Sequence, residues 1–112
     1  MNTKKMLLLS ISVAVLGTSS LFAEDTAPNT QDAEKTFRKC AGCHGVKGER
    51  KALGRSKVIA DMSEKDLKDA MHGYKDGSYG GPMKGLMKGQ VASMSDAEID
   101  KLAEYIATLK AK

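Results

Sequence analysis

The stretch Cys40-Ala41-Gly42-Cys43-His44 decides how the rest of the chain is interpreted. Two thiols three positions apart lie on one helical turn, so both can reach the vinyl groups of a single porphyrin. The imidazole that follows directly can then place a ring nitrogen on the iron. The run therefore predicts one covalently bound haem c, attached through Cys40 and Cys43, with His44 as one axial ligand.

Other uses of the two cysteines have less support. A Cys40–Cys43 disulfide would close a very small loop, and such a loop contributes little stability. A zinc site needs about four ligands, whereas the chain has two cysteines and two histidines, and His72 is distant from His44 along the sequence. A thioredoxin-like redox motif needs a βαβ setting, and no strand pattern precedes Cys40. Haem attachment is therefore the favoured interpretation.

Residues 1–23 are predicted to be a signal peptide that is cleaved after Ala23. Lys4 and Lys5 precede an apolar run at 6–16, which is too short to span a bilayer comfortably. An uncleaved membrane anchor is the alternative. We therefore expect a periplasmic protein that has no stable membrane insertion.

Cleavage would leave 89 of the 112 residues. A polar segment at 24–30 is expected to be flexible, and a single domain is expected at 31–112. A domain of this size buries limited apolar surface, so the large apolar body of a haem would help to fill its core. The formal net charge falls from +4 to +2 when Lys4 and Lys5 are removed. Nucleic-acid binding, which needs a dense basic face, is not expected.

The sequence predicts an all-α fold with three main helices. The first is expected to begin near Thr30 or Asp32 and to cover 33–42. Capping patterns at 63–66 and 95–98 are typical of helix starts and predict the other two. The last helix carries apolar residues at 3.6-residue spacing, namely Ile99, Leu102, Ala103, Ile106 and Leu109.

Glycines mark the irregular parts of the predicted fold. Residues 45–61 are expected to form a loop that can include one helical turn. The middle helix is expected to stop at Gly73, and the glycine-rich stretch at 73–89, which contains Pro82, is expected to be irregular.

The second axial ligand could come from the glycine-rich stretch, where the backbone can approach a flat ligand closely. Met83 and Met87 both lie there, and a thioether favours reduced iron and raises its potential. Spacing alone does not separate these two residues. His72 is a third candidate, although a lone histidine is more often solvated. The other methionines are expected to fill gaps in the core or to staple helix starts; they are Met62, Met71 and Met94.

Three stretches together make the chain similar to the small monohaem class I c-type cytochromes of bacteria. They are residues 37–45, residues 73–81, and residues 95–99 with 102–106, and they span most of the chain after the predicted signal peptide. The resemblance implies the class I cytochrome c fold, in which the helix of Phe37 crosses the helix of Tyr105 near a right angle. It also implies Met87 as the second axial ligand, with Met83 as the runner-up.

The expected function is that of a soluble one-electron carrier, because iron held by two strong ligands has no free position for a substrate. The resemblance implies a membrane cytochrome bc complex as electron donor and a terminal oxidase or haem peroxidase as acceptor. A monomer is expected. Four lysines are expected to flank the exposed haem edge and to meet acidic partners; they are Lys39, Lys47, Lys84 and Lys88.

Two other functions have less support from the residues. A haem sensor or small-ligand binder needs an open or weakly ligated iron, and a methionine ligand argues against this. An enzyme is not expected, because no Ser/His/Asp set is evident and both thiols are assigned to haem thioethers. The glycine stretch also does not fit a phosphate-binding loop.

Overall fold

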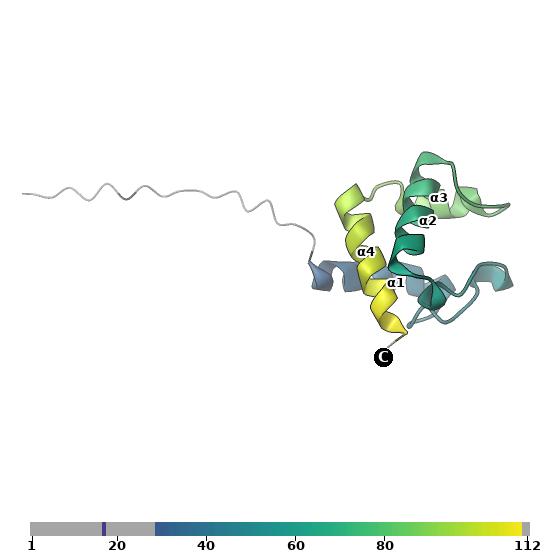
Figure 1. The fold of residues 1–112 in the computed structure, drawn as a ribbon, viewed down its shortest axis with the longest axis horizontal. Coiled ribbons are helices and arrows are strands. Elements are labelled where there is room, and N and C mark those ends of the chain that lie inside the picture. The colour runs from purple at the N-terminus through teal and green to yellow at the C-terminus, as the bar shows by residue number, and fades with distance from the viewer. Residues whose placement is uncertain (1–16, 18–28, 111–112) are drawn as a thin grey trace, which may run out of the picture.

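The computed structural model describes Gly17 and residues 29–110, and these residues contain helices and turns but no strand (Figure 1). The predicted signal peptide, apart from Gly17, and most of the predicted flexible segment at 24–30 lie outside the described residues. Four α-helices follow in the order α1 (Thr30–His44), α2 (Glu64–Asp76), α3 (Lys84–Val91) and α4 (Asp96–Leu109). Two 3-10 turns, Ala52–Gly54 and Ile59–Asp61, lie between α1 and α2. The all-α prediction is confirmed, with one helix more than expected.

A capping box fixes the start of α1. The side chain of Asn29 accepts hydrogen bonds from the backbone N–H groups of Gln31 and Asp32, at 2.8 and 3.0 Å, and so satisfies donors that have no partner within the helix. The helix therefore begins at Thr30, one of the two predicted starts, so the predicted flexible segment at 24–30 is one residue too long. The helix continues to His44, so that the whole cysteine and histidine motif lies on its last turns.

Helix α4 provides much of the core. Its start has the predicted capping box, in which Ser95 accepts from the N–H of Glu98 and Glu98 accepts from the N–H of Ser95. Its five predicted core residues are all buried. Helix α4 packs against both α1 and α2 and lies across α1 in Figure 1. The rings of Phe37 and Tyr105 meet there, with centroids 5.6 Å apart. The predicted contact between the first and last helices is confirmed.

The prediction that the middle helix, α2, stops at Gly73 is wrong. The helix continues to Asp76 and ends at Gly77, which has a left-handed conformation with φ of 87°. A glycine inside a helix costs about 1 kcal/mol relative to alanine, and tertiary packing can offset this cost. Leu67 and Met71 on the same helix are both buried in the core.

Helix α3 lies within the stretch that was predicted to be irregular. Two glycines lower its helix propensity, and no side chain caps its start. Packing instead stabilises it, because α3 lies against α2 and Val91 is buried in the core. Met83, Met87 and Val91 recur at four-residue spacing, which is a helical pattern that the glycines obscured.

The fully buried Ile99 allows a test of this packing. Ile99 has no solvent-exposed surface, so Ile99→Ala should leave a cavity and lower the free energy of unfolding by about 2–5 kcal/mol. Guanidinium unfolding of the haem-loaded protein measures this loss. The control is Lys35→Ala, at an exposed position of α1, which should change stability by no more than about 0.5 kcal/mol. Equal stability of the two variants would contradict the packing described for α4.

Candidate functional site

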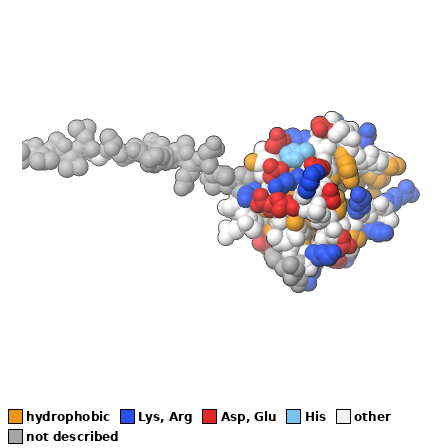
Figure 2. Space-filling model, in the orientation of Figure 1, with side chains coloured by type: hydrophobic (Ala, Val, Ile, Leu, Met, Phe, Trp, Pro, Cys, Tyr) orange, Lys and Arg blue, Asp and Glu red, His pale blue; other side chains and the backbone are white. Residues whose placement is uncertain are grey.

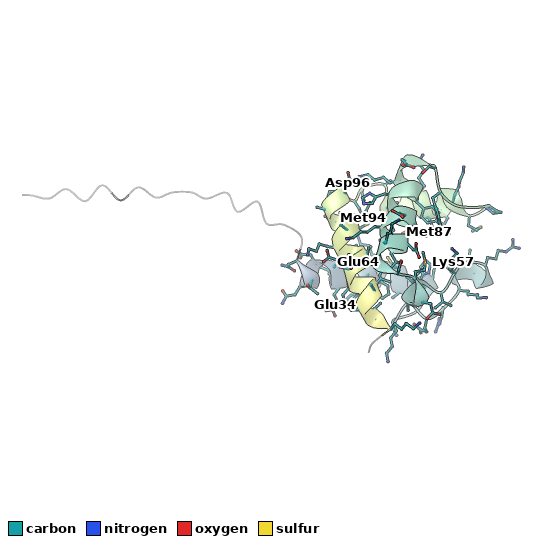
Figure 3. All side chains as sticks on the ribbon, in the orientation of Figure 1. Glu34, Lys57, Glu64, Met87, Met94 and Asp96 are labelled. Carbon is teal, nitrogen blue, oxygen red and sulfur yellow. The ribbon has the colours of Figure 1, made fainter. Side chains whose placement is uncertain are left out.

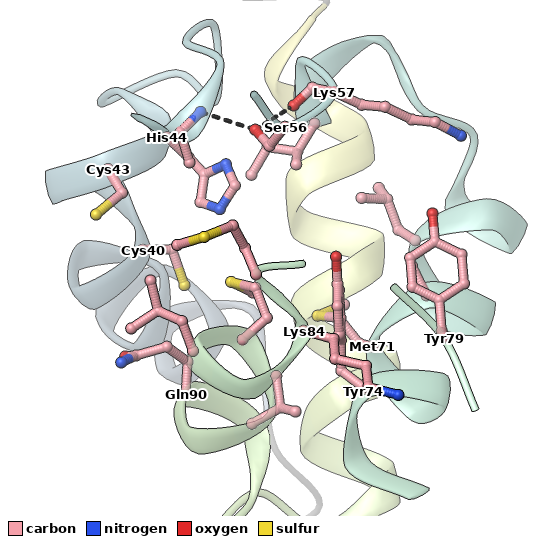
Figure 4. A pocket seen from close by; sticks show the side chains of 18 of the residues that line it. Cys40, Cys43, His44, Ser56, Lys57, Met71, Tyr74, Tyr79, Lys84 and Gln90 are labelled. Carbon is pink, nitrogen blue, oxygen red and sulfur yellow. Dashed lines mark hydrogen bonds between the residues drawn. The ribbon is translucent and has the colours of Figure 1, made fainter. Parts of the chain in front are cut away.

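A cavity of about 650 Å³ lies between the four helices and is bordered by the segment that carries the two 3-10 turns (Figure 4). This volume is within the range of about 300–1,000 Å³ that is typical of cofactor pockets. Buried apolar side chains from three helices form part of its wall; they are Leu67, Ala70, Met71, Val91, Leu102 and Ile106. The cavity is therefore suited to a large, mostly apolar group.

Both cysteines of the motif line this cavity. They are free thiols in the structure, Cys40 half-buried and Cys43 exposed, so the alternative of a Cys40–Cys43 disulfide is not what the structure shows. Burial raises the pKa of the Cys40 thiol, and the nearby Lys39 partly opposes this shift. Burial therefore favours the neutral form of the Cys40 thiol.

His44 supplies a buried imidazole on the same wall. Only 6% of its surface is exposed, and its Nδ1 atom has no hydrogen-bond partner among the described residues. Burial also lowers the pKa of His44, which favours the neutral ring, the form that binds metals. A buried polar atom without a partner calls for an explanation. Binding of a haem iron by the imidazole ring would explain why the ring lies on this wall. The residues present therefore fit a haem whose iron is bound by His44.

All five methionines in the described part of the chain line the cavity. Met71 is buried in the core, and Met62 and Met94 pack against the core from positions just before helix caps, as predicted. Met83 directly precedes α3 and is 38% exposed, whereas Met87, one turn further along (Figure 3), is half-buried. The structure thus brings both predicted ligand candidates to the cavity.

His72, the third ligand candidate, does not line the cavity. Its Nε2 atom lies 2.8 Å from a carboxylate oxygen of Asp100, and its Nδ1 atom lies 3.6 Å from one of Asp96. Both partners belong to α4, so His72 links α2 to α4 on another side of the molecule. It is therefore not placed to bind iron in this cavity.

The charged side chains around the cavity are all positive. Of the four lysines predicted to flank the haem edge, Lys39 and Lys84 line the cavity, whereas Lys47 and Lys88 do not. Sequence reasoning missed two other cations that line it, Arg55 and Lys57. The only signal for them was the abundance of basic residues in the 45–61 segment, which does not show where each side chain lies.

We call Lys39, Arg55, Lys57 and Lys84 the cationic rim. No Asp or Glu in the described residues lines the cavity, and no ion pair is found for a rim residue within 29–110. Most of the carboxylates lie on α2 and α4 instead. Figure 2 shows basic side chains beside hydrophobic ones at the right-hand edge, while acidic and basic side chains alternate over α1 and α4. The molecule therefore presents an asymmetric charge distribution.

Other kinds of site lack support in the part of the chain that the structure describes. No group of three or more His, Cys, Asp or Glu residues in 29–110 could hold a metal ion, so the zinc interpretation has no ligand set there. None of the described helices is both long enough and apolar enough to cross a membrane.

Comparison with known proteins shows the family. The profile of the family described as cytochrome c matches residues 30–110. Cytochrome c-553 of Helicobacter pylori strain J99 is 43% identical over 79 residues, which are 70% of this chain and 79% of that protein. Cytochrome c-553 of Nitratidesulfovibrio vulgaris is 32% identical over 105 residues, which are 93% of this chain and 96% of that protein. Cytochrome c-554(547) of Halothiobacillus neapolitanus is 32% identical over 79 residues.

The family match agrees with the cavity and with the residues that line it. The cofactor is a single haem c, which is bound covalently through Cys40 and Cys43. The predictions of an all-helical cytochrome c fold and of a protein that is not an enzyme are confirmed. The chain therefore belongs to the cytochrome c family, as a small bacterial monohaem electron carrier of the c-553 type.

Proposed function

We propose that His44 and Met87 are the two axial ligands of the haem iron, and that the protein carries single electrons in the periplasm. The observation that carries this proposal is the cavity itself, which is lined by the attachment motif at the end of α1 and by Met87 of α3. Met87 is favoured over Met83 because Met83 lies before the first turn of α3 and is the more exposed of the two.

Two strong ligands suit the iron to electron transfer rather than to binding of a substrate. A neutral imidazole and a thioether would occupy both axial positions, and the thioether favours the reduced iron. The apolar walls of the cavity limit the access of water, which reduces the solvent reorganisation that accompanies a change of iron charge. The chain thus supplies a mostly apolar site for one redox centre.

The surface around the cavity supports brief docking with acidic proteins. Two exposed apolar side chains line the same cavity as the cationic rim; they are Leu53 and Leu86, which are 63% and 48% exposed. Complementary charges speed encounter and orient partners without requiring tight binding. We infer that a membrane cytochrome bc complex is the donor and that a terminal oxidase or haem peroxidase is the acceptor, each offering an acidic patch to this face.

Neutralising two rim residues should change electron transfer according to the charge of the reagent. Lys57→Gln combined with Lys84→Gln should slow oxidation of the reduced protein by anionic hexacyanoferrate(III) at low salt, by about threefold or more. The same variant should speed oxidation by the cationic tris(phenanthroline)cobalt(III) ion. Stopped-flow measurements over a range of ionic strength provide both rates, and the difference between variant and wild type should shrink as salt is added.

The matched control is Lys35→Gln combined with Lys47→Gln, which removes the same charge from exposed positions that do not line the cavity. Its two rates should stay closer to those of the wild type. If both double variants changed the rates equally, net charge rather than the cationic rim would govern encounter, and the proposed docking face would be wrong.

A further inference from the structure

The turn between α2 and α3 is held against α2 by two contacts, each between a glycine and a tyrosine. A Cβ atom added to Gly73 would lie 2.4 Å from Cβ of Tyr79, and one added to Gly80 would lie 2.5 Å from Cε1 of Tyr74. The two tyrosine rings also meet edge to face, with centroids 5.0 Å apart. We call Gly73, Tyr74, Tyr79 and Gly80 the tyrosine–glycine clamp. Tyr79 packs against Gly73, and Tyr74 packs against Gly80.

The clamp is connected directly to the start of α3. A Cβ atom on Gly80 would also lie 2.8 Å from Cβ of Lys84, the first residue of α3. The backbone N–H of Tyr79 donates to the carbonyl oxygen of Gly73 at 3.2 Å, which ties the turn to α2. Since no side chain caps α3, these contacts rather than the helix's own sequence fix where its first turn lies.

Met87 lies within the next turn of the same short helix. Its backbone N–H donates to the carbonyl oxygen of Met83 at 3.3 Å, so a shift of the first turn would be passed to Met87. Functional groups work only when their supports hold them within about 0.5 Å of the productive geometry. A thioether ligand is therefore sensitive to the position of the helix that carries it.

We propose that the tyrosine–glycine clamp positions α3 so that the thioether of Met87 stays on the haem iron. Gly73 and Gly80 do not line the cavity and are positioning residues, because they act through α3, whereas Tyr74 and Tyr79 also line the cavity. This inference rests on the proposed ligation by Met87. The stretch 73–81 would then do more than fill space in the fold. Loss of the clamp should release Met87 from the iron under conditions in which the protein is still folded.

The test compares two glycine-to-alanine variants within helices. Gly73→Ala introduces a clash with a Cβ atom of Tyr79, which cannot swing away as the tip of a side chain can. Gly89→Ala, in α3, meets nothing within 4 Å and does not line the cavity. Both substitutions replace glycine by a better helix former, so their difference isolates the clamp.

The readout is displacement of the methionine by added imidazole in the oxidised, haem-loaded protein. Imidazole binds only when the thioether is off the iron, so its apparent affinity rises in proportion to the population of that state. Gly73→Ala should raise the affinity by about tenfold or more and weaken the long-wavelength iron–sulfur absorption band, whereas Gly89→Ala should change the affinity by less than about twofold. Amide hydrogen exchange should be faster in α3 of Gly73→Ala and unchanged in α4.

A second pair of variants guards against a misfolded Gly73→Ala protein. Tyr79→Ala removes the ring from the clamp and should raise the affinity for imidazole, whereas Tyr79→Phe keeps the ring contacts and should behave as the wild type. If Gly73→Ala and Tyr79→Ala both bound imidazole as weakly as the wild type, the clamp would have no positioning role. If Tyr79→Phe raised the affinity for imidazole as much as Tyr79→Ala, loss of the hydroxyl group rather than loss of the ring contacts would be responsible. The proposal would then be overturned.

The two proposals can fail separately. Ligation by Met87 is wrong if the iron–sulfur band survives in Met87→Ala. The clamp is wrong if Met87→Ala loses the band while Gly73→Ala keeps both the band and the wild-type affinity for imidazole.

Discussion

A chain in which Cys40 and Cys43 are both replaced by serine should carry no covalently bound haem. A serine hydroxyl does not form the thioether that links each cysteine to a vinyl group, and the two cysteines are the only ones in the sequence. Mass spectrometry of the denatured protein measures the loss, because one haem should be present in the wild type and none in the variant. The effect should be complete rather than partial.

The same variant should also be much less stable than the wild type. A domain of this size gains limited stability from its own core, and a cavity of about 650 Å³ with apolar walls would lose its anchored occupant. Single replacements of Cys40 or Cys43 are the controls, since each should retain one thioether and therefore one covalent haem. If the denatured double variant still carried haem, attachment through these two sulfurs would be wrong.

Replacing Met87 by alanine should lower the reduction potential by about 0.1 V or more, because a thioether ligand stabilises reduced iron. The variant should also lose the long-wavelength iron–sulfur band of the oxidised protein and should bind carbon monoxide readily when reduced. Potentiometric titration followed by absorption spectroscopy gives the potential and the band in one experiment. The change follows from the loss of one ligand, since Met87 is half-buried and a smaller side chain leaves the position open.

Met83→Ala is the matched control, because Met83 lines the same cavity and precedes the same helix. Its potential and spectrum should stay close to those of the wild type. The opposite pattern, with the band lost in Met83→Ala and kept in Met87→Ala, would assign the ligand to Met83.

The attachment motif, α4 and the starts of α1 and α2 could be predicted because their signals are local. Cys40, Cys43 and His44 are adjacent in sequence, and their chemistry requires them to be so. The capping box at Ser95 and the apolar spacing after it likewise specify α4 without reference to any other part of the chain.

Helix α3 and the continuation of α2 could not be predicted because tertiary packing decides them. Glycine favours a break, yet Gly73 lies inside α2, where Tyr79 of the following turn packs against its bare backbone. Such a contact involves residues from two elements and leaves no periodic pattern. The same reason explains the cationic rim, since Arg55 and Lys57 reach the cavity while Lys47, only a few residues earlier, does not.

The most direct test is an absorption spectrum, in both redox states, of protein purified from the periplasmic fraction of a host that attaches haem to exported chains. We expect one covalent haem per chain, an iron–sulfur band in the oxidised protein and no binding of carbon monoxide by the reduced protein. Colourless protein with free thiols would contradict haem attachment at Cys40 and Cys43. A coloured protein that lacked the band and bound carbon monoxide at once would indicate a ligand-binding haem protein instead of a carrier with His44 and Met87 on the iron.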